Sequence, residues 1–281
     1  MKITVTGAAG RLGHAALTAL TARGLTIHAT DRKYRKDTPV PIDVANLLDR
    51  DACYHLVEGS DVLVHLGNHV MIGEGGPQTT YSENCTMNIN IVQAAVEVGV
   101  KKIIYASSIQ VMGGERLRYS DPPIPSRLAY LPADGNLPAN ATNAYSLSKR
   151  SAEDMLAAVA RVEGLQTIAL RFPLLITKQH GEHLKQHPWK DYPKLDEAFA
   201  YLCVEDAGEL IAAIVEADLP GFRIYLPATR GTISAESPQE LIKRYFPNVP
   251  LKQPAETLTS LVDISQITRD TGWTPKIALF D

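Results

Sequence analysis

Apolar and polar positions along the first part of the chain follow two alternating periods. Short apolar runs typical of buried strands alternate with longer stretches in which apolar residues recur every three or four positions, as on one face of a helix. This alternation is typical of a parallel sheet covered by helices on both faces, and right-handed crossovers give it a doubly wound order. The predicted strands are Lys2–Val5, Thr26–Thr30, Asp61–Leu66 and Lys102–Ala106, and the predicted helices are Arg11–Arg23, Ala45–Glu58 and Ser82–Val98. The sequence therefore predicts a doubly wound α/β fold, whose strands end at a common crevice.

Three glycines follow the first strand in the run Thr6-Gly7-Ala8-Ala9-Gly10-Arg11-Leu12-Gly13. Glycine allows a tight turn, a close approach to a pyrophosphate and close packing of the next helix, whose first N–H groups bind anions. Asp31 ends the second strand roughly 20 residues later, where an acid accepts hydrogen bonds from an adenosine ribose. The spacing departs from the commoner G-x-G-x-x-G, so a plain strand-to-helix turn stays open as an alternative. Asp43, after a short predicted strand at Val40–Ile42, fits either an adenine-side contact or a simple turn.

Composition narrows the class of protein. The chain has 281 residues, of which 45% are hydrophobic and 21% are charged, so it can bury a sizeable core. Its three cysteines are widely spaced and odd in number, which predicts reduced thiols and a cytoplasmic protein. A net charge of -3 gives no long-range attraction for nucleic acid, and the one dense basic run, Arg32–Lys36, reads as a solvated loop or as a 2′-phosphate contact. Because no apolar run approaches the roughly 20 residues that span a bilayer, no membrane partner is expected either.

A second group of polar residues has a spacing that suits proton transfer. Ser107 and Ser108 end one predicted strand, and Tyr145 and Lys149 stand four residues apart at the start of a long predicted helix, on one face. An ammonium beside a phenol favours the phenolate and lowers the tyrosine pKa from about 10 toward neutrality, where the group can exchange a proton. A hydroxyl from the strand end could orient a substrate alcohol toward that tyrosine. An exposed helix face is the alternative, since the tyrosine–lysine spacing alone is common.

Together these segments resemble the extended short-chain dehydrogenase/reductase superfamily, and within it the NAD-dependent epimerase/dehydratase group. The glycine run is similar to the group's cofactor loop, and Tyr145 with Lys149 to its catalytic pair. Further motifs extend the resemblance over nearly the whole length: Val64-His65-Leu66-Gly67-Asn68, Asn84 before Asn90–Ala95, Tyr105–Gly113, Leu170-Arg171-Phe172-Pro173, Val204-Glu205-Asp206-Ala207 and Gly272-Trp273-Thr274-Pro275.

The resemblance implies a role for each matching residue. The catalytic residues would be Ser108, Tyr145 and Lys149, with Ser108 selected over Ser107 by its distance from Gly113. The residues implied at an NAD cofactor, with NADP left open, are Gly7, Gly10, Arg11, Leu12, Gly13, Asp31, Asp43, Val44, Leu66, Gly67, Asn84, Tyr145, Lys149, Phe172 and Pro173. Ser108, Gln110 and Arg171 would contact a sugar-like substrate. If that substrate is an anion, Arg171 or a group from the 178–190 loop would supply a cation.

The same resemblance implies a domain organisation and a partner. Residues 1–173 would form the NAD(P)-binding Rossmann domain, and 174–281 a small substrate-binding lobe from which 204–228 returns to the first domain. A homodimer through the helices Ser82–Val98 and Tyr145–Glu163 is the family expectation.

Departures from the family pattern bear on the reaction. Ser108-Ile109-Gln110 replaces the Thr-Asp-Glu run of sugar-nucleotide dehydratases, so dehydration is disfavoured. Three hypotheses stay open: a dehydrogenase of a free sugar or uronic acid, an epimerase that keeps its cofactor, and a non-catalytic dinucleotide sensor. His180, His183 and His187 lie in a 178–190 loop interpreted as a solvent-facing lid, and no metal site is expected there.

Overall fold

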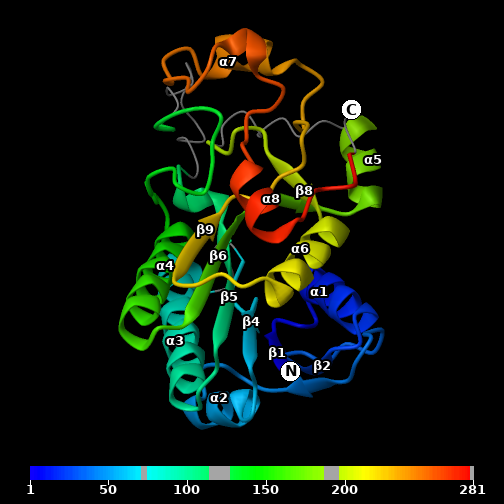
Figure 1. Cartoon of the computed structure of the whole chain (residues 1–281), viewed down its shortest axis with the longest axis vertical. Coiled ribbons are helices and arrows are strands. Elements are labelled where there is room, and N and C mark those ends of the chain that lie inside the picture. The colour runs from blue at the N-terminus through cyan, green and yellow to red at the C-terminus, as the bar shows by residue number, and fades with distance from the viewer. Residues whose placement is uncertain (71–74, 114–126, 187–195, 279–281) are drawn as a thin grey trace.

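A seven-stranded parallel sheet forms the centre of the molecule, with the strand order β3-β2-β1-β4-β5-β6-β9 (Figure 1). The computed structural model describes residues 1–70, 75–113, 127–186 and 196–278. The strands are β1 Lys2–Thr6, β2 Thr26–Asp31, β3 Ile42–Val44, β4 Val62–His65, β5 Lys102–Ser108, β6 Gln166–Phe172 and β9 Phe222–Tyr225, with a separate parallel pair β7 Leu174–Ile176 and β8 Tyr201–Cys203. The predicted α/β class with a Rossmann-type sheet is confirmed.

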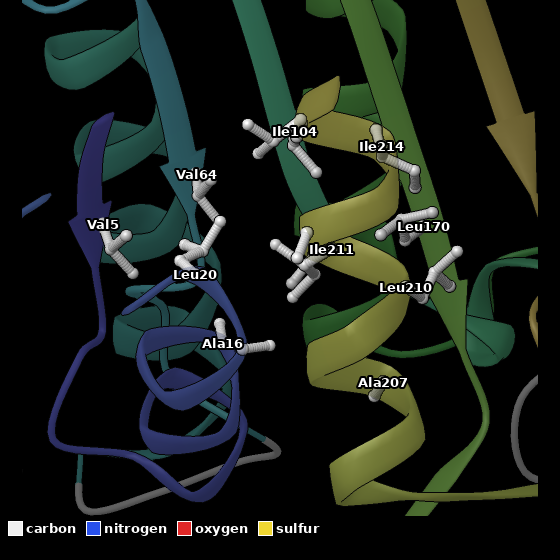
Figure 2. Close-up of a cluster of buried hydrophobic side chains, with 14 of the residues drawn as sticks. Val5, Ala16, Leu20, Val64, Ile104, Leu170, Ala207, Leu210, Ile211 and Ile214 are labelled. Atoms are coloured by element: carbon white, nitrogen blue, oxygen red, sulfur yellow. The ribbon is translucent and has the colours of Figure 1, made fainter. Parts of the chain in front are cut away.

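Helices cover both faces of this sheet. They are α1 Arg11–Ala22, α2 Arg50–Val57, α3 Gly76–Glu97, α4 Ala144–Glu163, α5 Lys178–Gln186, α6 Val204–Glu216, α7 Pro238–Tyr245 and α8 Ser265–Thr271. Figure 2 shows Ala16 and Leu20 of α1 and Ile211 of α6 beside strand residues such as Val64 and Ile104. On the opposite face, residues of α2, α3 and α4 share a second core with β4 and β5. Both faces are thus apolar, as parallel strands require.

Close backbone contact explains how α1 and α6 lie side by side over the sheet. A Cβ at Gly208 of α6 would stand 2.5 Å from the carbonyl oxygen of Ala15, so only glycine permits this approach. Through α6 and the edge strand β9, the chain after residue 203 contributes to the same core as the N-terminal strands.

A third apolar cluster lies beyond the carboxyl ends of the strands. It is formed by segments that precede α4 and by α7 with the chain around it, including Leu131, Leu137, Leu241, Phe246 and Leu261. Figure 1 shows α7 and the chain around it, which contribute to this cluster, beyond the end of the sheet that is opposite α2.

Several element boundaries differ from the predicted ones. The helix predicted from Ala45 begins at Arg50, because the Asp49 side chain accepts hydrogen bonds from the N–H groups of Asp51 and Ala52 and so caps the helix there. The helix predicted from Ser82 begins at Gly76, and the short strand predicted at 40–42 is Ile42–Val44. Residues 178–186, expected as a loop, form α5. None of the helices in the described part of the chain is both long and apolar enough to cross a membrane.

Candidate active site

The glycine turn between β1 and α1 is held by backbone packing. Gly7 has φ +68°, and a Cβ there would lie 2.6 Å from the carbonyl carbon of Leu66 at the end of β4. A Cβ on Gly13 would stand 2.2 Å from the carbonyl oxygen of Gly7, whereas one on Gly10 would be 3.2 Å from the same oxygen. The turn therefore fits tightly against the helix and the β4 end, and it presents the open N-terminus of α1. That is the geometry in which backbone N–H groups bind a phosphate.

The side chains of this turn divide between core and surface. Leu12 packs against the sheet core, whereas Arg11, the first residue of α1, is exposed. Gly67 stands directly beside the turn, where a Cβ would be 3.1 Å from the Thr6 hydroxyl.

Asp31 stands at the end of β2 and touches the turn. Its carboxylate accepts hydrogen bonds from the N–H of Ala9 at 3.0 Å and from the N–H of Lys33 at 3.0 Å. Arg35 reaches back to the carbonyl of Ala9 and also pairs with Asp37, which lowers the pKa of that carboxyl to about 2 through its hydrogen bond with Arg35. The basic run expected as a solvated loop is thus folded in part against the glycine turn.

Asp43 and Val44 lie on the edge strand β3, one strand farther out. The Asp43 carboxylate is 3.2 Å from Nε2 of His28. Val44 pairs in register with Asp31, and 56% of its side chain is exposed. Both residues therefore border the Asp31 side of the strand-end crevice.

Ser108 and Ser107, at the end of β5, point to different partners because successive strand residues face opposite ways. The Ser108 hydroxyl lies close enough to Tyr145 to lower the pKa of that phenol, and it accepts the N–H of Gln110 at 3.2 Å. The Ser107 hydroxyl donates to Glu153 at 2.6 Å. Ser108 is thus the serine that the fold brings to the tyrosine.

Local capping fixes the start of α4, where Tyr145 is the second residue. Asn143 accepts the N–H of Ser146, and the Ser146 hydroxyl accepts the N–H of Asn143 in return. Gln110, predicted as a substrate contact, accepts a hydrogen bond from the Asn143 side chain at 3.3 Å. It borders the site through this contact.

Lys149 lies one turn farther along α4 and is 3% exposed. Its Nζ donates to the carbonyl of Ala106 at 2.7 Å and to Oδ1 of Asn68 at 2.9 Å, and it lies 5.6 Å from the centre of the Tyr145 ring. Ser108, Tyr145 and Lys149 are therefore gathered at the carboxyl ends of β4 and β5.

Burial sets the protonation of this group. It raises the pKa of Tyr145 to about 12, against the effect of the Ser108 hydrogen bond and in the same direction as the negative charge of Glu197. It also lowers the pKa of Lys149 to about 7, opposed by the charge of Glu153. The tyrosine pKa thus moves opposite to the direction expected from the lysine, because Lys149 is buried and Tyr145 is half-buried.

Arg171 does not fit its predicted role at the substrate. Its guanidinium is 2% exposed, bonds Glu153 with Nε and Nη2 at 2.9 and 2.8 Å, and donates Nη1 to the carbonyls of Gly135 and Leu137. With the donors engaged in this way, Arg171 holds a buried ion pair and anchors the 135–137 segment. Phe172 and Pro173 follow it at the end of β6, where Phe172 pairs with Ser108 and packs in the core.

Asn84 likewise bonds protein groups. Its side chain accepts the N–H of His69 at 2.8 Å and donates to the His69 carbonyl and to the hydroxyl of Ser148. It is fully buried, so it braces α4 behind the site instead of facing a cofactor.

Sequence reasoning missed Asn68 and Asn88. Asn68 follows the β4 strand end, and Asn88 stands four residues after Asn84 on the same face of α3, and this spacing is the signal that could have drawn attention to them. Metal ligands were not expected, and within the described residues no three histidine, cysteine or acidic side chains cluster in a way that could hold a metal ion. His187 lies outside those residues.

The sequence model of the NAD dependent epimerase/dehydratase family matches residues 3–195. The chain belongs to this family. It is a family of NAD-dependent enzymes, so the predicted epimerase/dehydratase family is confirmed.

Curated relatives of this epimerase/dehydratase chain are distant. Uronate dehydrogenase from Pseudomonas syringae pv. tomato is 27% identical over 175 residues, which cover 60% of this chain and 58% of that protein. UDP-glucose 4-epimerase from Azospirillum brasilense is 26% identical over 61% of this chain and 48% of its own length. NAD-dependent glucose-6-phosphate dehydrogenase from Haloferax volcanii is 25% identical over 77% of this chain and 80% of its own. The matches thus span only about half of the length of the first two relatives.

Solved structures share the whole fold. UDP-glucose 4-epimerase from Bifidobacterium longum, in complex with NAD+ and UDP, has a TM-score of 0.72 at 18% identity and covers 100% of this chain and 95% of its own. L-threonine dehydrogenase from Cupriavidus necator has a TM-score of 0.72 at 19% identity, with 100% and 96% covered. At these identities the likeness shows the fold alone.

Proposed function

We propose that this chain is an NAD(P)-dependent oxidoreductase that transfers hydride between the cofactor and a hydroxyl-bearing carbon of a sugar, sugar acid or sugar nucleotide. The observation that carries the proposal is the meeting of Ser108, Tyr145 and Lys149 at the strand ends, next to the glycine turn. Named relatives that act on sugars support the substrate class.

The residues of the glycine turn fit a dinucleotide. Its glycines let the turn pack closely against the end of β4 and the start of α1, and the first N–H groups of α1 would donate to a pyrophosphate. Asp31 would accept the hydroxyls of the adenosine ribose, which favours NAD over its 2′-phosphorylated form. Asp43 and Val44 would border the adenine, and Leu66, Gly67, Phe172 and Pro173 would border the nicotinamide half.

When bound, the nicotinamide accepts or returns a hydride. Tyr145 takes the proton of the substrate hydroxyl during oxidation and gives it back during reduction, while Ser108 donates a hydrogen bond to the reacting oxygen. Lys149 binds the nicotinamide ribose and, when protonated, stabilises the tyrosinate. Because burial keeps Tyr145 protonated near neutral pH, oxidation depends on that neighbouring positive charge.

We assign the substrate pocket to residues 174–186, 196–203 and 229–278 together with the 135–137 segment. The apolar cluster of Leu131, Leu241 and Phe246 would form the wall of this lobe. Since Arg171 is engaged by Glu153, a cation for a uronic acid would come from the other source expected for it, the segment that begins at Lys178.

Dimerisation through α3 and α4 completes the proposal. Tyr81 on α3 and Leu147 on α4 are 42% and 45% exposed, and the Tyr81 hydroxyl lies 3.5 Å from that of Ser151 on α4. Exposed apolar side chains on two helices that already pack together suit a second copy of the same pair.

A cofactor and turnover assay tests the function. Purified protein is checked for bound dinucleotide by mass spectrometry and absorbance, and NADH formation is then followed on free sugars, sugar phosphates, uronic acids and sugar nucleotides. Release of NADH identifies a dehydrogenase, whereas retained cofactor with interconversion of sugar epimers identifies an epimerase, the second candidate suggested by the family. Dinucleotide binding without either reaction contradicts the proposal and leaves the sensor.

A further inference from the structure

Lys149 has a second hydrogen-bond acceptor that the expected catalytic set does not contain. Of the three N–H groups of its ammonium, one goes to the Ala106 carbonyl and one to Oδ1 of Asn68, at 2.7 and 2.9 Å. Since Lys149 is nearly inaccessible to water, these protein oxygens replace its hydration. Because these two hydrogen bonds fix the rotation of the ammonium, they also set the direction of its third N–H.

The amide of Asn68 is itself fixed on both sides. Its Nδ2 donates to the carbonyl of Gly67 at 3.0 Å and to Oδ1 of Asn88 at 2.9 Å. Its Oδ1 also accepts the hydroxyl of Tyr105 at 2.9 Å. Rotation of the amide would place Nδ2 against Lys149 and break these bonds, so the oxygen is held toward the ammonium.

Beyond Asn88 the hydrogen bonds continue to the glycine turn. The Thr6 hydroxyl accepts the N–H groups of Leu66 and Gly67, so its own hydrogen goes to Nδ1 of His65 at 2.7 Å. His65 therefore carries its proton on Nε2 and donates it to Oδ1 of Asn88 at 2.9 Å. One buried network links the turn that would hold the cofactor to Lys149.

We propose that Asn68 is a positioning residue, whose side-chain oxygen holds the Lys149 ammonium against Ala106 and aims its remaining N–H into the strand-end crevice. The contact stands on geometry, but its use in hydride transfer rests on the proposed function. Because Asn68 belongs to the same hydrogen-bond network as Thr6 and Gly67, this network fixes the position of Lys149 relative to the glycine turn.

The charged and titratable groups around Lys149 define what Asn68 adds. Glu153 and Tyr145 face it from its own helix, the Tyr105 ring lies 4.7 Å away on β5, and His65 on β4 is neutral, since burial lowers its pKa to about 3. Against this background the Asn68 oxygen stabilises the ammonium over the neutral amine.

The test measures the Lys149 pKa directly, by NMR titration of protein with ¹³C- and ¹⁵N-labelled lysine, and uses Lys149→Arg to assign the signal. Asn68→Ala should lower this pKa by about one unit, since a hydrogen bond to a charged group is worth roughly a tenfold change in equilibrium. Asn68→Asp keeps an oxygen and adds a negative charge, so it should raise the pKa. Asn90→Ala is the matched control. Asn90 lies on α3, two residues after Asn88, but its side chain donates to the carbonyls of Leu47 and Leu48 and not to the network of Lys149.

Opposite shifts in the two Asn68 variants support the proposal, because a merely structural role gives no such sign reversal. A Lys149 pKa that neither variant moves, or that Asn90→Ala moves equally, overturns it. If Asn68→Ala does not fold, Asn68→Ser takes its place, because its shorter side chain also withdraws the oxygen from the ammonium and should lower the pKa. The titration needs neither cofactor nor substrate, so a chain that shows these shifts but no turnover refutes the proposed function and leaves the positioning role standing.

Discussion

Burial decides the charge state of individual functional groups in this molecule. Lys149 is buried and Tyr145 is half-buried, and each is shifted toward its neutral form, the tyrosine to a pKa of about 12 and the lysine to about 7. A sequence pattern with correct spacing predicts that such groups meet, but the direction of their pKa shifts depends on how much water reaches them. The proton-transfer role of Tyr145 then becomes a testable property of one hydroxyl.

Tyr145→Phe removes that hydroxyl and keeps the ring. We expect turnover to fall by roughly 10²–10⁴-fold, the usual contribution of a positioned general acid or base, while NAD binding stays close to that of the unmodified chain. Steady-state kinetics and calorimetric titration with NAD measure the two effects. Tyr34→Phe, at an exposed tyrosine, is the control, and full activity in Tyr145→Phe would refute the mechanism.

His65 makes the folded state sensitive to acid. Burial lowers its pKa to about 3, so between pH 6.5 and 3 the unfolded chain binds a proton that the folded chain does not, and stability is lost as the pH falls through this range. The loss attributable to His65 should reach about 4 kcal/mol near pH 3.5. Urea unfolding from pH 7 to 3.5 measures it by comparison with His65→Gln.

In His65→Gln the acid-dependent loss should shrink, although the variant starts less stable because it disturbs the network with Thr6 and Asn88. His55→Gln, at an exposed histidine of α2, removes a histidine without this burial and serves as the control. Parallel pH profiles for the chain and His65→Gln would show that His65 is not the group responsible.

At the scale of elements, the four strands predicted in the first part of the chain were located to within a few residues, because buried strands carry an unbroken apolar run. Helix starts were less accurate. The residues after Ala45 have helical periodicity, but α2 begins only at Arg50, because the Asp49 side chain caps it there. The spacing of apolar residues does not show at which residue a capping side chain starts a helix.

The same limit explains which site residues could be predicted. Ser108, Tyr145 and Lys149 stand at strand and helix ends that topology brings together, so sequence reasoning placed them. Arg171 is also at a strand end, but its partner Glu153 comes from α4 and its carbonyl partners from the 135–137 segment. Its engagement depended on long-range packing that no local pattern reveals.

The pairing of β2 with the glycine turn gives Asp31 its testable role. Asp31→Ala removes a carboxylate that would accept NAD ribose hydroxyls and repel a 2′-phosphate, so NAD should bind more weakly and the preference for NAD over NADP should fall by roughly tenfold, or about 1.4 kcal/mol. Dissociation constants for both cofactors measure this. Asp154→Ala, which removes an exposed carboxylate on α4, controls for net charge. An unchanged ratio would exclude Asp31 as the ribose ligand.

At the scale of the whole molecule, the sheet supports both the candidate site and the proposed dimer surface. The carboxyl ends of its strands carry the residues of the candidate site, next to the third apolar cluster, and α3 and α4 cover one of its faces. Because Tyr145 and Lys149 lie on α4, a dimer formed through α3 and α4 would also stiffen the helix that carries these two proposed catalytic residues. Oligomeric state and activity are therefore expected to change together.

Leu147→Glu tests this link, because it places a charge on the exposed face of α4 two residues from Tyr145. In a dimer the new carboxylates would be buried at the interface without partners, a cost large enough to separate the subunits. Light scattering after gel filtration should give twice the 30.7 kDa of the chain for the unmodified protein and the single mass for Leu147→Glu. Leu251→Glu, at an exposed leucine outside α3 and α4, should stay dimeric. A monomeric unmodified chain would refute the dimer, whereas a monomeric Leu147→Glu with full turnover would show that the catalytic pair does not depend on the second copy.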